Sequence, residues 1–428
     1  MIKCAFYEKE ITPPLGSEIP GYYAVRVSTG VLDRLYVKSA VFGSDEPCAA
    51  IISIDAVELP GDICQKIAAR VQEFTGIPAE AVGICATHTH LGIPCGEPVG
   101  AKSDDKYMEE LCRIAADCVT LAAQRLRPCN VSFGTGSVGD ISFVRDYLMR
   151  DGSVCTNPTA SAEILRPYSE NDPLVPVLAF YDQDGVPTGA LISFACHHDC
   201  IGGTQFSGDY SSELSRQLKA RYGNEFVSVY LAGACGDINH INFPAGTASN
   251  YLDMGRRLAA QAASIIDASG PSLCGDVTSQ RSVVHCAYRR ASADEIETAK
   301  RVLSTGEADS HTMLGSLMSE LLLDYESKIS ASGKTELPLP IQLITVCGIN
   351  IFMLPGEIYH EFASQIRREA GSSCLFATLC NGDFGYIPTP DLFGSCVYPV
   401  QLCEGSKLEP AAGEKIVRAA VALAKSPC

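Results

Sequence analysis

The sequence lacks the features that would assign it to a membrane or secreted class. No stretch approaches the ~18 consecutive apolar residues of a membrane-spanning helix, and the N-terminal segment has neither the apolar core nor the cleavage pattern of a signal peptide. The chain contains 20 cysteines but no C-x-x-C pair of the kind found in zinc fingers and redox sites. We therefore expect a cytoplasmic protein without integral membrane association, whose cysteines are reduced and act mostly as small buried side chains.

Several common catalytic motifs are missing as well. The chain has no G-x-S-x-G turn, no Walker-type phosphate loop and no H-E-x-x-H helix. Residues 134–139 match G-x-G-x-x-G, but the segment that follows, Asp140-Ile141-Ser142, does not predict a helix. These observations argue against the corresponding hydrolases, nucleotide-binding proteins and metalloproteases.

Positive charge is scarce. The chain has 33 Lys and Arg against 50 Asp and Glu, which gives a formal net charge of −17. Such an acidic surface repels the phosphate backbone of nucleic acids and anionic lipid headgroups. We therefore expect a small-molecule substrate and no nucleic-acid partner, and the sequence does not indicate an oligomeric state.

The pattern of apolar residues predicts alternating strands and helices. Short runs rich in Val, Ile and Phe are typical of buried strands, and the stretches between them have the three- and four-residue spacing of amphipathic helices. We expect an α/β fold with a central mixed β-sheet flanked by helices, in one domain over residues 1–428. The predicted strands are 36–42, 49–54, 82–86, 176–181, 190–195, 226–231, 283–288, 341–346 and 349–354, and the predicted helices are 62–74, 106–126, 211–221, 250–268, 293–303, 359–369 and 412–424.

One segment stands apart from this alternation. Residues 292–334 are polar and helix-prone, so we expect them to form a helical insertion beside the core. Residues 271–275 contain Pro and Gly and are a weak candidate for a domain boundary.

The first chemical motif is Thr87-His88-Thr89-His90, which follows the predicted strand 82–86. Side chains two residues apart on an extended backbone point to the same side, so His88 and His90 are predicted to project together from the strand end. Ligands bind at the carboxyl ends of strands in α/β sheets. Because imidazole is a common metal ligand, the pair favours a metal site over two structural histidines.

A second histidine pair, His197 and His198, closes the predicted strand 190–195. Adjacent residues on an extended chain face opposite sides, so only one of the two is predicted to join the site of His88. Asp209, at the start of the next helix, offers a carboxylate that could orient a ligating imidazole. Four of the eight histidines lie in these two motifs, and this clustering is the strongest indication of function.

Three further residues are open to more than one interpretation. Glu357 lies between a predicted strand and a predicted helix, so it is either a metal ligand or a carboxylate that stabilises the helix N-terminus. Asp383, in a Gly-rich turn, is either a ligand or an ordinary turn residue. Cys235 could act as a nucleophile only if its pKa were lowered.

The motifs occur in the same order as in neutral ceramidases, and the chain resembles the catalytic domain of that family over essentially its whole length. The shared motifs are T-H-T-H with a Gly-rich loop, a strand ending in F-A-x-H, a G-D turn, P-G-E before a helix, and G-Y followed by T-P. In the family, two His, one Glu and one Tyr hold a single zinc ion. The resemblance implies the zinc ligands His88, His197, Glu357 and Tyr386, and it implies that His90 and Arg145 contact polar groups of the substrate or the developing oxyanion.

Two departures from the family change the expected chemistry. Ceramidases carry a serine nucleophile at the fourth position of the G-D turn, where this chain has Asn239. An amide side chain can only orient a water molecule or donate a hydrogen bond to an oxyanion. The family also has an export signal and an additional C-terminal domain, neither of which we recognise here. We therefore expect a ceramidase-like hydrolase that does not act on long-chain ceramide.

These residues predict hydrolysis by a metal-activated water. Zinc lowers the pKa of a bound water from ~15.7 toward ~7, and the resulting hydroxide could attack a small amide, ester or lactone directly. In this scheme Arg145 and His90 stabilise the oxyanion, and Asp237 or Asn239 positions the water. His198 would carry the proton to the leaving group.

Two alternatives stay open. Zinc could act as a Lewis acid in an isomerase or lyase that converts a polar metabolite such as a sugar acid. The chain could instead be a non-enzymatic, metal-stabilised binding protein, whose structural site would be closed by four protein ligands. Similar ligands would also accept iron or manganese.

Overall fold

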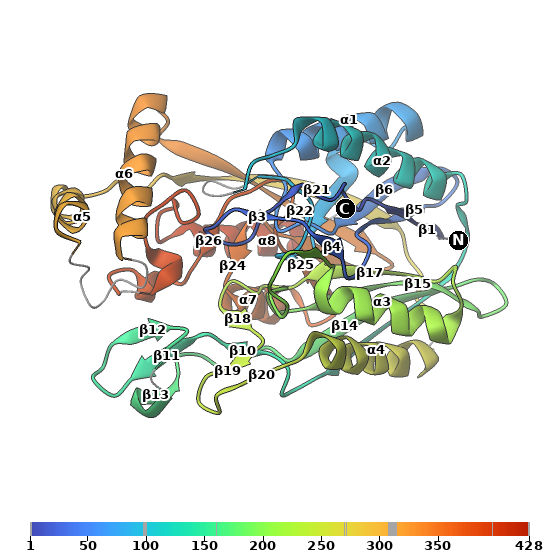
Figure 1. Ribbon diagram of the computed structural model, residues 1–428. Coiled ribbons are helices and arrows are strands. Elements are labelled where there is room, and N and C mark those ends of the chain that lie inside the picture. The colour runs from blue at the N-terminus through green and yellow to red at the C-terminus, as the bar shows by residue number, and fades with distance from the viewer. Residues whose placement is uncertain are drawn as a thin grey trace.

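The computed structural model describes residues 2–96, 101–159, 161–268, 270, 272–306, 315–395 and 397–426. Its main elements are three mixed β-sheets with helices packed on their outer faces, which confirms the predicted α/β class (Figure 1). Each sheet contributes at least one strand whose carboxyl end leads into the candidate site. Within the described part of the chain, no helix is both long and apolar enough to cross a membrane.

The first sheet has the strand order β7-β6-β5-β1-β8. Strand β6 pairs antiparallel with β5 and parallel with β7, so the sheet is mixed. Helices α1 and α2 lie side by side over it, because each presents one apolar stripe to the strands (Figure 1). The bounds are β1 Lys3–Glu10, β5 Tyr36–Gly43, β6 Pro47–Ile54, β7 Val82–Ala86, β8 Arg127–Pro128, α1 Gly61–Thr75 and α2 Asp105–Ala123.

The second sheet has the order β17-β15-β14-β9 and is covered by helices α3 and α4, which pack side by side and run in the same direction (Figure 1). Strands β15 and β17 are parallel and are buried along almost their whole length, as their continuous apolar runs require. The bounds are β9 Asn130–Ser137, β14 Leu174–Tyr181, β15 Pro187–Phe194, β17 Val227–Ala232, α3 Asp209–Tyr222 and α4 Tyr251–Ala268.

The third sheet has the order β21-β22-β23-β25, with α8 packed against β21 and β22 and α7 packed against α8. An apolar cluster joins all three sheets; it includes Phe42, Phe180, Leu231, Ile351 and Leu375. The bounds are β21 Val277–Ala287, β22 Glu336–Val346, β23 Ile349–Met353, β25 Cys374–Ala377, α7 His360–Ala370 and α8 Ala412–Lys425.

The predicted helical insertion corresponds to two helices between β21 and β22, α5 Ala293–Thr305 and α6 Gly315–Ser332. A capping box formed by Ser292 and Glu295 begins α5. The two helices pack on each other at one side of the molecule, away from α1 to α4 (Figure 1). Residues 307–314 of the predicted insertion, and Pro271 of the weak boundary, lie outside the described residues.

Short strands bring distant segments together around the site. Strand β10 (Phe143–Val144) pairs with β18 (Ile238–Asn239), and β24 (Glu357–Ile358) pairs in parallel with β26 (Tyr386–Ile387) so that Glu357 and Tyr386 are direct partners. The remaining short strands are β2 Glu18–Ile19, β3 Arg26–Val27, β4 Gly30–Val31, β11 Asp146–Met149, β12 Val154–Thr156, β13 Ile164–Pro167, β16 Gln205–Phe206, β19 Ile241–Asn242 and β20 Thr247–Ala248.

Candidate metal centre

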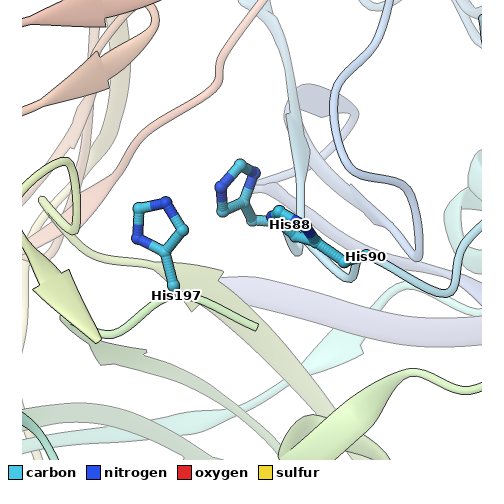
Figure 2. Close-up of side chains that lie close together, drawn as sticks. All are labelled: His88, His90 and His197. Carbon is cyan, nitrogen blue, oxygen red and sulfur yellow. The ribbon is translucent and has the colours of Figure 1, made fainter. Parts of the chain in front are cut away.

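Three histidines converge beyond the ends of strands β7 and β15. One ring nitrogen from each of His88, His90 and His197 can be chosen so that the three atoms all lie within 4.8 Å of one another. Figure 2 shows the three rings facing a common space. His88 and His197 are almost completely buried. The spacing of these atoms is short enough for a single metal ion to contact them.

The backbone reaches this arrangement differently from the prediction. Strand β7 ends at Ala86, and His88 adopts a left-handed conformation with φ 71°, so the two histidines do not project from an extended strand. The His88 amide donates to the carbonyl of Ala56 at 2.9 Å, which holds this turn against the first sheet. The rings of His88 and His90 nevertheless meet edge to face, with centroids 5.0 Å apart.

Backbone carbonyls orient the two buried imidazoles. His88 Nδ1 lies 2.8 Å from the carbonyl oxygen of Val57, and His197 Nδ1 lies 2.7 Å from that of Cys235. A carbonyl can only accept a hydrogen bond, so each Nδ1 carries the proton and each neutral ring directs the lone pair of Nε2 toward the centre. This tautomer is the one that histidine ligands adopt when a second group fixes the outer nitrogen.

Glu357 places its carboxylate between the two imidazoles. Its Oε2 atom is 3.3 Å from His88 Nε2 and 3.0 Å from His197 Nε2. Both Glu357 Oε2 and His88 Nε2 are buried and have no partner with hydrogen-bond geometry. Buried polar atoms without a partner are costly, and a cation would satisfy both atoms together. The position of this side chain favours the ligand interpretation of Glu357 over the capping interpretation.

Tyr386 completes a donor set of two imidazoles, a carboxylate and a phenol. Its hydroxyl oxygen is 3.5 Å from His197 Nε2, and its ring stacks on His197 with an interplanar angle of 11°. The pairing of β24 with β26 brings Tyr386 next to Glu357. Nitrogen and oxygen donors of these types are those that bind zinc in proteins, so the residues present fit a zinc ion.

Electrostatics favour the metal-binding ionisation states of Glu357, His197 and His90, whereas at His88 burial is outweighed by the Glu357 carboxylate, which raises the pKa of the imidazole. Although burial opposes the charge on Glu357, His88 and His197 hold the pKa of its carboxyl well below the usual range. Burial lowers the pKa of His197 to about 4, with Arg145 adding to the effect. Burial together with the neighbouring His88 also holds the pKa of His90 well below its usual value. A carboxylate and neutral imidazoles are the ligating forms.

Arg145 brings a positive charge next to the centre. Its Nη1 atom lies 3.4 Å from His197 Nε2, and Nη2 donates to the carbonyl of Gly236. The guanidinium carbon lies 5.1 Å from the centroid of the Tyr386 ring. The side chain is buried, so solvent screens its charge less than that of a surface arginine.

The structure keeps His198 and Asp209 away from the centre. The fully buried His198 ring stacks on Tyr210, with centroids 3.8 Å apart. The Asp209 carboxylate accepts hydrogen bonds from the amides of Cys200 and Ile201 at 2.8 and 3.2 Å, so it orients backbone and not an imidazole. The prediction for Asp209 is therefore wrong, and proton transfer by His198 has no geometric support.

Asp237, Asn239 and Cys235 are also engaged elsewhere. Asp237 accepts from His360 Nδ1 at 2.6 Å, and Asn239 donates to Asn157 at 3.1 Å while accepting from the amide of Ile241 at 2.9 Å. Both side chains are thus held in place by other residues of the protein. Burial raises the pKa of Cys235 far above its usual value, so the thiol stays protonated and is not an activated nucleophile.

Two residues of this region were not predicted. His360 is a single histidine at the start of α7, and only its proximity to Asp237 in space reveals its role. Glu58 follows strand β6 and lines the cavity described next. The available signal was an acidic residue four positions beyond the end of a buried strand, but most of the other residues that line this cavity are distant in sequence.

A cavity of about 110 Å³ opens directly beside the centre. His88, His90 and Glu357 line one part of it, and Tyr23 of the N-terminal segment and Leu321 of α6 line another. A cavity of ~150 Å³ accommodates benzene. The space next to the candidate ligands therefore accommodates a small group.

The fold and the site together define an α/β protein with a candidate metal centre at the carboxyl ends of strands from its three sheets. No protein-family model and no curated protein matches the sequence. Among solved structures, neutral ceramidase from Pseudomonas aeruginosa matches with a TM-score of 0.72 and 18% identity, covering 99% of this chain and 74% of that chain. A ceramidase complexed with C2 matches with a TM-score of 0.70 and 19% identity, covering 99% and 75% of the two chains. The chain thus has the fold of neutral ceramidases, as the order of its motifs predicted.

Proposed function

We propose that this protein is a zinc-dependent hydrolase that cleaves a small amide, ester or lactone with a metal-activated water. One observation carries the proposal, namely the convergence of two buried imidazole Nε2 atoms on the Glu357 carboxylate. The likeness in fold to ceramidases, which are hydrolases, supports the same class of reaction. The chemistry follows from the donor set and does not depend on the likeness alone.

The zinc ion would be held by His88, His197, Glu357 and Tyr386. When bound, zinc supplies a Lewis acid that polarises a carbonyl group and acidifies a water molecule. The residues around it keep bulk water out, because all four side chains are at least nine-tenths buried. We propose water as the oxygen nucleophile, because this chain has Asn239 at the position where neutral ceramidases have a serine.

Two further residues would act on the substrate. The Arg145 guanidinium, with its Nη1 atom 3.4 Å from His197, is placed to stabilise negative charge on the carbonyl oxygen. His90 is neutral, and both of its ring nitrogens lack a hydrogen-bond partner. It can therefore donate to the substrate from one nitrogen and accept from the other.

Two further observations support the proposed location and the proposed kind of substrate. All 18 cysteines among the described residues are free thiols, which supports a reducing, cytoplasmic compartment. The cavity of about 110 Å³ supports a small-molecule substrate and argues against a long-chain ceramide.

Metal analysis of the purified protein tests the centre directly. We expect about one zinc ion per chain in the natural protein, and loss of bound zinc in His88→Ala and in Glu357→Ala. His285→Ala is the matched control, because His285 is an exposed histidine on β21 with 61% of its side chain accessible. Retention of zinc by the first two variants would refute the assigned ligands.

Labelled water tests the reaction class. The zinc-loaded protein is incubated with a panel of amides, esters and lactones in oxygen-18 water, and the products are examined by mass spectrometry. Hydrolysis incorporates one solvent oxygen into the released acid, whereas an isomerase or lyase need not incorporate any. Turnover without incorporation would refute the proposed reaction.

A further inference from the structure

His90 is the third imidazole at the candidate centre, and its ring nitrogens are unsatisfied. Only 12% of its side chain is exposed, and neither Nδ1 nor Nε2 has a hydrogen-bond partner among the residues that the structure describes. A buried imidazole in this state costs free energy unless another group satisfies its nitrogens. Figure 2 shows the ring facing the space that it shares with His88 and His197, so a ligand in that space would be its partner.

Hydrogen bonds to the main chain hold His90 beside the segment that carries His197. The His90 amide donates to the carbonyl of His198 at 3.0 Å, and Thr89 forms a parallel bridge with His198. Arg26 donates to the His90 carbonyl at 2.6 Å. The position of His90 relative to His197 is therefore fixed by the backbone.

The Nδ1 atom of His90 faces the N-terminal segment and Asp199. A Cβ atom at Gly21 would lie 2.8 Å from His90 Nδ1, so the Gly21 backbone packs directly on this part of the ring. Asp199 Oδ1 lies 3.9 Å from Nδ1, and the Tyr22 hydroxyl donates to the same oxygen. Nε2 is therefore the nitrogen of His90 that remains for the centre.

A carboxylate behind a ligating imidazole is a common arrangement in zinc proteins. It accepts the outer N–H and directs the other ring nitrogen toward the metal. His88 and His197 have a backbone carbonyl in this place, and His90 has the Asp199 carboxylate. All three histidines thus have an oxygen atom on the Nδ1 side of the ring.

The distances allow one ion to bind all three rings. One nitrogen from each histidine lies within 4.8 Å of the other two. Because zinc–nitrogen bonds are about 2.0–2.1 Å long, two nitrogens on one ion are at most ~4.2 Å apart. A shift of the His90 side chain by roughly 1–2 Å would therefore bring its nitrogen onto an ion held by the other two.

We propose that His90 is a third imidazole ligand of the zinc ion in the substrate-free protein, and that Asp199 orients it. This inference rests on the proposed function and deepens it by adding a ligand to the centre. A substrate that enters the centre competes with His90 for the ion. The displaced imidazole stays beside the substrate, where one nitrogen donates a hydrogen bond and the other accepts one.

Cobalt substitution tests the number of ligands. Co²⁺ binds to the same kinds of ligand as zinc, and its visible absorption weakens as the coordination number rises. We expect the cobalt-loaded His90→Ala protein to absorb more strongly than the natural protein, because it has lost one ligand. His285→Ala is the matched control, since it removes an exposed histidine on β21, and its spectrum should be that of the natural protein.

Zinc affinity, measured by competition with a chelating indicator, tests both residues. Loss of an outer partner lowers metal affinity by about 10- to 100-fold. Asp199→Asn should weaken zinc binding by about tenfold, the lower end, because the amide oxygen can still accept from the Tyr22 hydroxyl. His90→Ala removes the ligand itself and should weaken binding by about 100-fold or more. Asp45→Asn, which changes a fully exposed carboxylate, should leave the affinity unchanged.

Acetohydroxamate, which chelates zinc and cobalt, tests the displacement of His90. At saturation it should make the cobalt spectra of the natural protein and of His90→Ala alike, because the imidazole has left the ion in the first and is absent from the second. Spectra that stay different would refute the displacement.

The outcomes separate this inference from the proposed function. If the natural protein binds neither zinc nor cobalt, the metal centre is wrong and the third imidazole ligand falls with it. If it binds both, and His90→Ala keeps the natural cobalt spectrum and zinc affinity, the centre stands and His90 is not a ligand.

A crystal structure of the zinc-loaded natural protein gives a measurement that depends on no variant. His90 Nε2 is expected about 2.0–2.1 Å from the ion. A distance beyond ~3 Å would overturn the assignment of His90 while leaving the other ligands in place.

Discussion

The buried ion pair between His360 and Asp237 gives the sharpest prediction about stability. His360 Nδ1 lies 2.6 Å from Asp237 Oδ2, and the His360 amide donates to Asp237 Oδ1 at 3.0 Å. The pair links the start of α7 to the turn that follows β17. Backbone carbonyls of this turn accept hydrogen bonds from His197 and from Arg145. Its loss should therefore weaken the fold and the centre together.

The structure also sets the size of the effect. Although burial opposes the charge on His360, the Asp237 carboxylate outweighs it and raises the pKa of His360 from 6.5 to about 9. At ~1.4 kcal/mol for each tenfold change in proton affinity, this corresponds to ~3 kcal/mol of stability. Removing one partner of a buried pair costs about 3–5 kcal/mol, which is of the same size.

The sign of the pH dependence follows from the raised pKa. A group whose pKa is higher in the folded state stabilises the fold fully below its unfolded pKa, here 6.5, and loses that contribution as the pH rises through about 9. Asp237→Asn should therefore lower the free energy of unfolding by ~3 kcal/mol at pH 6.5, and the difference from the natural protein should shrink toward pH 9 and above.

Urea denaturation followed by far-ultraviolet circular dichroism measures this difference, since the chain has no tryptophan for fluorescence. Asp253→Asn serves as the control: Asp253 pairs with Arg257 at 3.9 Å on the surface of α4. Such an exposed pair contributes at most about 1 kcal/mol. A deficit in Asp237→Asn that stays constant across this pH range would refute the coupling to His360.

Three further predictions concern the centre. Arg145→Ala should lower kcat by roughly 100- to 1,000-fold, the usual cost of losing an oxyanion donor, with zinc content preserved; steady-state kinetics and metal analysis measure both. Gly236→Ala should destabilise the fold by ~1–3 kcal/mol and reduce the amount of bound zinc, because the new Cβ atom would lie 2.3 Å from the carbonyl oxygen of Glu357. Gly202→Ala is the control: a Cβ atom there has no neighbour within 4 Å, so stability and zinc content should both stay unchanged. Removing zinc with a chelator should lower the melting temperature, and restoring it at a hundredfold excess over Kd should return ~2.7 kcal/mol of stability; an unchanged melting curve would contradict a resident metal.

Local apolar patterns were enough to find most of the buried strands and most helices, but they failed where contacts distant in sequence determine the structure. Strand β9 was missed because its sequence, NVSFGTGS, has few apolar residues. Gly134 and Gly136 allow α4 to approach this strand closely, since a Cβ at either position would lie within 2.7 Å of the Ile265 or Gln261 side chain. The same glycines produced the misleading G-x-G-x-x-G match.

The order of the motifs predicted which residues gather at the site, but not how each side chain is used. The four candidate ligands come together because the strands that precede them end at one place; they are His88, His197, Glu357 and Tyr386. The left-handed turn at His88 depends instead on contacts with the first sheet that sequence spacing does not encode. The partner of Asp237 was likewise hidden, because His360 lies more than a hundred residues away along the chain.

Asn239 occupies the position at which neutral ceramidases have a serine, and its role determines whether this turn takes part in the reaction. Both ends of its amide are already occupied, by Asn157 at 3.1 Å and by the Ile241 backbone at 2.9 Å. Asn239→Ala should therefore cost ~1–3 kcal/mol of stability, since it leaves a buried partner unsatisfied, while kcat per zinc-loaded molecule stays nearly unchanged. A residue that positions the attacking water would instead lower kcat by ~100-fold or more without destabilising the fold. Because thermal unfolding and kcat respond in opposite ways under the two roles, measuring both on one preparation assigns Asn239 to the structure or to the reaction.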